Sequence, residues 1–62
     1  MPNFIINVAV MNLYKEPNFR SEVLTQGLLG ESCSILEQSD NWTKIKQWDG
    51  YEGWANNFYG II

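Results

Sequence analysis

The chain has 62 residues, of which 45% are hydrophobic and 15% aromatic, and its formal net charge is −3. A chain of this length forms one small domain, residues 1–62, with a single core, and its composition is too apolar for a disordered segment. Four basic residues against seven acidic ones argue against nucleic acid and anionic membrane surfaces as partners, because both attract clusters of Lys and Arg.

Several further classes of protein are disfavoured by what the sequence contains. One cysteine cannot form an internal disulfide, and without histidine we expect neither a zinc site nor any other cofactor. The apolar runs are far too short to insert into a membrane. The first residues show no basic segment followed by a long apolar one, so we expect no secretory signal here. They fit a native N-terminus and an excised domain equally.

The first third of the chain predicts a strand and then a long loop. Residues 4–11 are apolar except for Asn7, which is typical of a strand with one buried face. Residues 12–21 mix charged and turn-forming side chains, and Pro17-Asn18 would interrupt a strand ladder. We therefore expect a folded-over loop over residues 12–21.

The middle of the chain predicts two further strands. Residues 23–29 fit both a helical stripe and a strand, but Gly27 and Gly30 leave too few residues for a stable helix. We expect a short strand and a turn. In residues 31–37, polar and apolar positions alternate, and this alternation turns Cys33 and Ile35 inward.

A hairpin is predicted after a turn at residues 39–41. Residues 42–48 form its first strand, with Thr43 and Ile45 facing the core and Trp42 facing away. Asp49-Gly50 is the pair typical of a two-residue type I′ turn, in which both residues have a positive φ.

The returning strand carries a glycine and is followed by a second turn. Gly53 suits a close approach by another backbone or by an aromatic ring, with Trp54 on the opposite face. Residues 55–58 predict a tight turn, and residues 59–62 a closing strand. Five or six short antiparallel strands without a helix predict an all-β fold, a small barrel.

The aromatic residues are the strongest candidates for a binding surface, because a barrel of this size cannot bury all of them and exposed aromatic clusters mark interaction sites. The candidates are Tyr14, Trp42, Tyr59, Trp48, Tyr51 and Trp54. We expect a groove built from Tyr14, Trp42 and Tyr59, with Trp48 as the next candidate. Part of the exposure has a structural explanation, with Tyr51 or Trp54 lying over Gly53 to brace the hairpin.

Catalysis by this chain is disfavoured. Cys33 has no histidine to act as its base, and its place in a strand predicts a core residue. Asp49 and Glu52 are close in sequence, but a turn role and a solvated strand face account for them.

A set of short motifs, taken together in this order and spacing, resembles bacterial SH3 domains over roughly residues 6–60. The motifs are Asn12-Leu13, Glu16-Pro17, Ser21-Glu22-Val23-Leu24-Thr25-Gln26, Leu29-Gly30-Glu31, Ile35-Leu36-Glu37, Trp42, Lys44-Ile45 and Asp49-Gly50-Tyr51-Glu52-Gly53-Trp54. The chain looks most like the SH3 domains at the front of NlpC/P60-type cysteine peptidases. One departure is Tyr14, where many bacterial SH3 domains carry Arg.

The resemblance implies an SH3-like barrel that acts as an accessory module, without chemistry of its own, in an enzyme that cleaves peptidoglycan stem peptides. Its partner would be cell-wall peptide or its own peptidase domain, in the bacterial cell envelope or the cytoplasm. Eukaryotic SH3 domains are similar at Leu13-Tyr14, Trp42 and Tyr59, but the proline usual before that tyrosine is missing. The alternative is a free-standing protein-interaction domain, including a homodimer.

Overall fold

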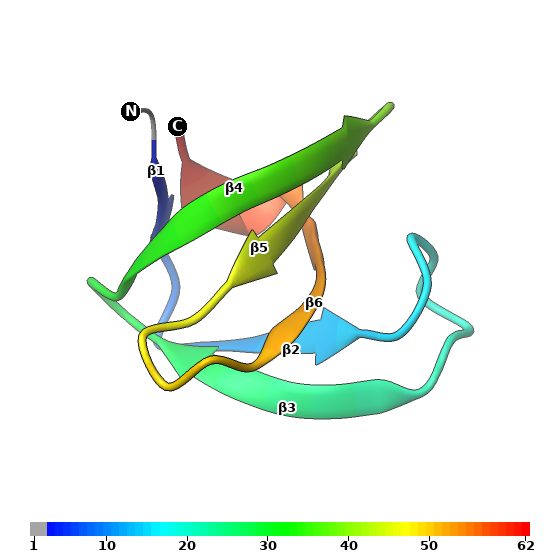
Figure 1. Ribbon diagram of the computed structural model, residues 1–62, viewed down its shortest axis with the longest axis horizontal. Helices are drawn as coiled ribbons and strands as arrows, with labels where there is room; N and C mark the ends of the chain where they lie inside the picture. Colours follow the sequence, from blue (N-terminus) through cyan, green and yellow to red (C-terminus); the bar gives the residue numbers. More distant parts are fainter. Residues whose placement is uncertain (1–2) are drawn as a thin grey trace.

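The computed structural model describes residues 3–62, and its strands form one antiparallel sheet that curls around a single core (Figure 1). Within these residues the elements are, in chain order, β1 (Asn3–Ile6), β2 (Val10–Tyr14), β3 (Val23–Leu28), β4 (Ser32–Ser39), β5 (Trp42–Lys46), β6 (Glu52–Asn56), a 3₁₀ turn η1 (Asn57–Tyr59) and β7 (Gly60–Ile61). The all-β prediction is confirmed, and over the described range the strands number seven where five or six were expected.

The strand order is β3-β2-β6-β5-β4-β1-β7, and the two edge strands β3 and β7 do not pair with each other. The sheet is therefore curled around the core without closing, which is consistent with the predicted small SH3-like barrel. A single pair, Tyr14 with Trp54, joins β2 to β6 and so connects the two halves of the sheet.

The predicted strand over residues 4–11 is wrong, because the chain breaks there into β1 and β2. The buried residues change from even positions, Phe4 and Ile6, to the odd position Met11 across the break. Between the two strands, Asn7 N–H donates to the Tyr59 carbonyl at 2.9 Å, and the Ala9 carbonyl accepts from Leu29 N–H at 3.2 Å. The segment thus crosses from the β1–β7 side of the sheet to the β2–β3 side, which a straight strand cannot do.

The predicted loop over residues 12–21 begins too early, because β2 continues to Tyr14. The loop itself spans residues 15–22 and is closed by a bond from Lys15 N–H to the Glu22 carbonyl at 2.9 Å. Inside it, Glu16 N–H donates to Ser21 Oγ at 2.8 Å, and Arg20 N–H to Asn18 Oδ1 at 3.0 Å. These bonds fold the loop back on itself, as predicted.

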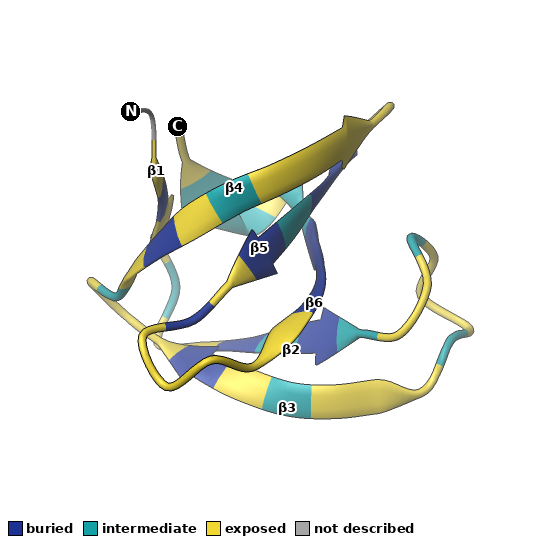
Figure 2. Cartoon of the chain, in the orientation of Figure 1, coloured by how far each residue is buried: buried dark blue, intermediate teal, exposed yellow. Residues whose placement is uncertain are grey.

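The core is formed by seven fully buried residues from five strands. They are Phe4, Ile6, Met11, Leu13, Cys33, Ile45 and Ala55. Figure 2 shows buried positions on β1, β2, β5 and β6, whereas most of β3 and the far half of β4 are exposed. The inward positions predicted for Cys33, Thr43 and Ile45 are confirmed, while Ile35 is only half-buried.

The hairpin turn differs from the predicted type I′ turn. Gly50 has φ of +92°, but Asp49 does not have a positive φ. Gly50 N–H donates to the Gln47 carbonyl at 2.9 Å, and Gln47 N–H to the Tyr51 carbonyl at 2.8 Å. This is a three-residue loop, residues 48–50, in which the glycine provides the left-handed residue that forms a bulge. Trp48 therefore lies in the turn and pairs with no residue of β6.

The close approach expected at Gly53 is confirmed. A β-carbon at this position would lie 3.0 Å from Leu13 Cβ and 3.2 Å from the Tyr14 carbonyl oxygen, so the absence of a side chain lets β2 cross over β6. The three atoms nearest to that β-carbon belong to Leu13 and Tyr14 of β2, and the bracing of the hairpin by Tyr51 or Trp54 stays a prediction.

The turn expected at residues 55–58 begins two residues later. Ala55 and Asn56 still belong to β6. Asn56 then caps η1, its side-chain oxygen accepting the Phe58 N–H at 3.0 Å. The predicted closing strand is present as the two-residue β7, which pairs with β1 through Ile5 opposite Ile61 and Ile6 opposite Gly60.

Candidate functional site

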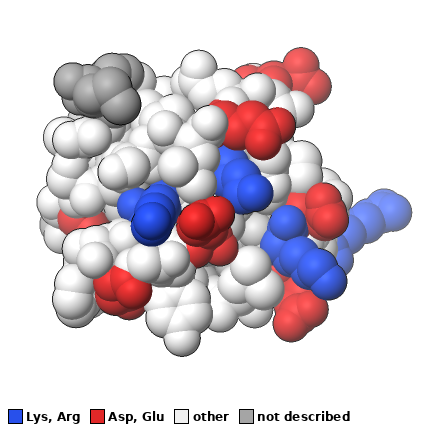
Figure 3. Space-filling view, viewed as in Figure 1, with Lys and Arg blue, Asp and Glu red and all other residues white. Residues whose placement is uncertain are grey.

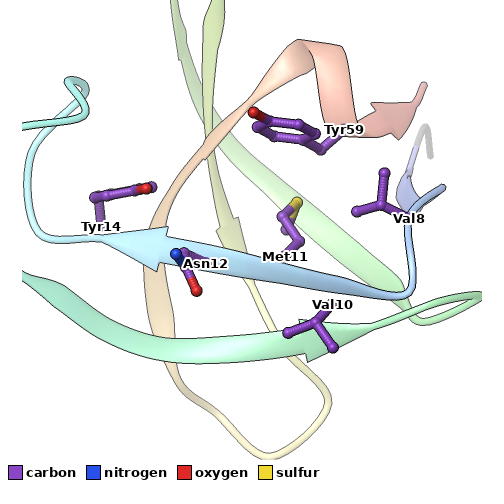
Figure 4. Close-up of a pocket in the computed structure, with 6 residues that line it drawn as sticks. All are labelled: Val8, Val10, Met11, Asn12, Tyr14 and Tyr59. Atoms are coloured by element: carbon purple, nitrogen blue, oxygen red, sulfur yellow. The ribbon is translucent and has the colours of Figure 1, made fainter.

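A pocket of about 220 Å³ lies beside β2 and η1 (Figure 4). It is lined by Val8, Val10, Met11, Asn12, Tyr14 and Tyr59. Figure 4 shows Tyr14 and Tyr59 on two sides of the cavity, with Met11 at its base between them. This site is called the Tyr14–Tyr59 pocket below.

One wall of the pocket is held in place by bonds around η1. Thr43 Oγ1, fully buried on β5, lies 2.6 Å from Asn57 Oδ1 and donates its hydroxyl proton to it. Asn57 N–H donates to the Asn41 carbonyl at 2.8 Å, and the Tyr59 carbonyl accepts from Asn7. With both ends of η1 bonded to other segments, the ring of Tyr59 is fixed over the core. A rigid wall of this kind reduces the entropy lost on binding.

The opposite wall depends on an aromatic cluster formed by Tyr14, Phe19 and Trp42. Their rings meet edge to face, with centroid distances of 5.6 Å between Tyr14 and Trp42, 5.8 Å between Tyr14 and Phe19, and 4.8 Å between Phe19 and Trp42. Trp42 is only 8% exposed. It lies outside the central core cluster, but it is buried against Tyr14 and Phe19 and does not line the pocket. Trp42 therefore packs against the ring of Tyr14 and supports this wall of the pocket without lining it.

The floor of the pocket offers one polar group from β2. Asn12 Oδ1 accepts a hydrogen bond from Gln26 Nε2 on β3 at 2.9 Å. This bond occupies the amide oxygen, so the group that Asn12 can offer to a ligand is its nitrogen, a donor. Apolar walls with few oriented polar groups are the usual lining of small-ligand sites.

The remaining predicted site residues lie elsewhere. Trp54 is 8% exposed and pairs with Tyr14 of β2 in the sheet, whereas Trp48 and Tyr51 are exposed at the β5–β6 turn. Of the six candidates, the structure brings only Tyr14 and Tyr59 together in one pocket, with Trp42 behind Tyr14.

Sequence reasoning missed the pocket residues Val8, Val10, Met11 and Asn12, and also Phe19 in the aromatic cluster. The sequence predicts a single strand over residues 4–11, which includes Val8 and Val10. A single strand does not contain the break between β1 and β2 that places these two residues at the pocket. Phe19 is an aromatic residue in an otherwise polar loop, and that contrast was the one available signal for it.

The lone thiol lies away from the pocket, in the core. Cys33 is 1% exposed, and burial raises the pKa of its thiol above the ordinary value of 9.0, with further contributions from the charges of Glu31 and Asp49. A raised pKa keeps the thiol protonated and therefore weakly nucleophilic. Asp49 Oδ1 accepts the Tyr51 N–H at 3.3 Å, which is the expected turn role.

The described part of the chain offers neither a metal-binding cluster nor a membrane-spanning helix. Residues 3–62 contain no group of three or more Cys, Asp or Glu side chains arranged to hold a metal ion. Over the same residues, no helix has the length and apolar character needed to cross a membrane.

Comparison with known proteins identifies the family. The family model described as bacterial SH3 domain matches residues 8–59, which include both walls of the Tyr14–Tyr59 pocket and the β5–β6 hairpin. No curated protein matches the chain. Bacterial SH3 domains are non-catalytic binding modules. Because the match covers most of the chain, this protein belongs to the bacterial SH3 domain family.

Proposed function

We propose that this chain is the binding module of a peptidoglycan stem-peptide hydrolase and that it takes cell-wall peptide in the Tyr14–Tyr59 pocket. The observation that carries the proposal is the pocket itself, about 220 Å³ in volume, with two tyrosine rings at its sides and one oriented amide. Aromatic faces suit sugar rings and peptide backbones, and the amide of Asn12 gives a ligand carbonyl a fixed donor. The resemblance to the SH3 domains of NlpC/P60-type peptidases supplies the class of ligand.

The charge balance of the chain supports a ligand with a free amine. Seven acidic residues against four basic ones leave the surface net negative, which attracts a cationic group such as the amine of a stem peptide. Docking of the same surface on the peptidase domain is the other form of this proposal. It would leave the isolated module without affinity for wall peptide.

The test is an NMR titration of the chain with muropeptide, free stem peptide and a proline-rich peptide. We expect saturable shifts of the backbone amides of Val8, Asn12 and Tyr59 with wall fragments and none with the proline-rich peptide. Val10→Lys should abolish these shifts, because Val10 is 52% exposed at the pocket edge and a long cationic side chain would occupy the cavity.

Leu36→Lys is the matched control, since Leu36 is similarly exposed at 47% on β4 and does not line the pocket. It should bind wall fragments as the parent does. Absence of shifts with every wall fragment would rule out direct binding, and equal loss in both lysine variants would remove the pocket from the proposal.

A homodimer is the second candidate, because β3 has a strand partner on one side only. Its other side is partly occupied, however. Leu28 N–H donates to the Glu31 carboxylate, and the Gln26 carbonyl accepts from Gln47 Nε2 at 3.2 Å. Side chains that satisfy edge groups in this way disfavour pairing with another strand. Sedimentation equilibrium decides between the two, and we expect a monomer.

A further inference from the structure

Trp48 combines high exposure with a fixed orientation. Its side chain is 81% exposed at the tip of the β5–β6 hairpin, yet its indole N–H donates to Glu31 Oε1 at 2.9 Å. The bond joins residues 17 positions apart and connects the hairpin tip to the turn between β3 and β4. An exposed tryptophan is unfavourably solvated and makes few packing contacts, so packing in the folded chain does not explain why the orientation of Trp48 is fixed.

The carboxylate that holds Trp48 is itself anchored. Glu31 Oε2 accepts the Leu28 N–H, and Glu31 N–H donates to the Leu28 carbonyl at 3.1 Å. Each oxygen therefore accepts one hydrogen bond and keeps a lone pair for a further donor. The indole face and the carboxylate beside it form a rigid pair.

The charge around Trp48 is negative. Asp49 follows it in the turn, and both Glu31 and Asp49 act electrostatically on the buried Cys33 thiol, raising its pKa, so both charges lie at this end of the molecule. The nearest basic residue in sequence, Lys46, lies directly opposite Glu52 in the β5–β6 register. In Figure 3 acidic side chains lie at the left edge and the lower left of the molecule, and a basic side chain lies next to them, left of centre.

Apolar surface adjoins this charged corner. Leu28 shares the Glu31 carboxylate with Trp48 and is 58% exposed, and Leu29 is 63% exposed. A partner group that suits the corner would be a cation with an aliphatic stem and a flat face. The arginine side chain meets all three requirements, because its aliphatic stem carries a planar cation that stacks on indole rings and binds carboxylates through two parallel N–H groups.

We propose that Trp48, Glu31 and Asp49 form a second binding surface, which takes an arginine side chain presented by a protein partner. The guanidinium stacks on the exposed indole face and donates to Glu31, Asp49 adds to the attraction, and the arginine stem lies against Leu28. This surface is distinct from the Tyr14–Tyr59 pocket, and none of its residues lines that pocket.

The test uses two capped peptides, Ac-Ala-Leu-Arg-Leu-Ala-amide and its citrulline counterpart, which has the same shape without the charge. Both are titrated into the ¹⁵N-labelled chain while the indole N–H signal of Trp48 is followed. We expect saturable shifts with the arginine peptide, with a dissociation constant of the order of 1 mM, and at least about fivefold weaker binding of the citrulline peptide. Equal shifts with both peptides, or no shift of Trp48, would overturn the proposal.

Variants separate this surface from the pocket. Trp48→Ala, followed through the backbone amides of Glu31 and Asp49, should remove binding of the arginine peptide, and Asp49→Asn should weaken it severalfold while keeping the acceptor for Tyr51 N–H. Phe58→Ala removes an aromatic residue of similar exposure, 83%, and should bind normally. Val10→Lys, which blocks the pocket, should leave the arginine peptide bound. Loss of binding in Phe58→Ala as well would contradict the assignment of this surface. Shifts of the Trp48 signal that depend on protein concentration in the absence of peptide would also contradict it, and they would indicate that the surface binds a second copy of this chain.

Discussion

Gly60 lies directly against the ring of Phe4. A β-carbon at position 60 would overlap three carbons of that ring, and Phe4 is fully buried. The contact lets β7 pair with β1 immediately beside the core. Because a side chain at position 60 would meet the Phe4 ring, this pairing depends on a residue without a β-carbon at that position.

Gly60→Ala should therefore destabilise the chain by about 1–3 kcal/mol, the usual cost of overpacking a core. Urea denaturation measures the change. Phe4→Leu in the same chain should recover part of the loss, because a smaller side chain gives the methyl group room, so the double mutant should be more stable than the sum of the single effects predicts. Strict additivity would show that the two residues do not compete for the same space.

Thr43→Val should cost about 1–2 kcal/mol of unfolding free energy, because Asn57 Oδ1 would lose the buried hydroxyl that donates to it. Thr43→Ser keeps that hydroxyl and loses only a methyl group, so it should be the milder variant. The amide shifts of η1, which carries Tyr59, should move in Thr43→Val and stay near their original values in Thr43→Ser. If the serine variant is the less stable one, packing outweighs the hydrogen bond at this position.

Phe19→Ala should loosen the loop over residues 15–22 and uncover Trp42. We expect a loss of about 0.5–1.5 kcal/mol from the missing aromatic contacts, together with faster hydrogen exchange at the Trp42 indole. Arg20→Ala, one residue further along the same loop, is the control and should change neither quantity. Unchanged exchange in Phe19→Ala would mean that Tyr14 alone is enough to cover Trp42.

The stability of the chain should fall in alkaline solution because of Cys33. The pKa of the thiol is raised in the folded state, chiefly by burial, whereas the unfolded chain ionises near the ordinary value of 9.0. The stabilisation is fully present below pH 9 and is lost as the pH rises from there through the raised pKa of the folded state. Unfolding free energies between pH 7 and 10, under reducing conditions, should decline more steeply for the parent than for Cys33→Ala. Parallel curves would exclude this thiol as the cause.

Much of the fold follows from local pattern. Alternation placed Thr43, Ile45 and Cys33 inward correctly, since one face of each strand is buried. The break between β1 and β2 was not predictable in the same way. Residues 7–9 contain neither Gly nor Pro, and the bonds that hold them come from Tyr59 and Leu29, which are distant in sequence.

The candidate site shows the same division. A surplus of aromatic residues indicates that some rings are exposed, but it does not say which ones, because the residues that bury a given ring come from other parts of the chain. Trp42 is buried by Phe19 from a loop that looked merely polar, while Trp48 is left exposed because the turn has three residues and not two. The binding role of the six aromatic candidates stays a prediction.

The pairing of β1 with β7 also decides how the domain responds to force. Antiparallel neighbours place the start of β1 beside the end of β7, and Figure 1 shows these two strands next to each other. Tension applied at these ends pulls the two strands apart like a zipper, so it breaks the few bonds of the ladder one after another and never loads them together. The domain should therefore yield at low force from this side, with the core strands β4, β5 and β6 opening only after β7 has peeled away.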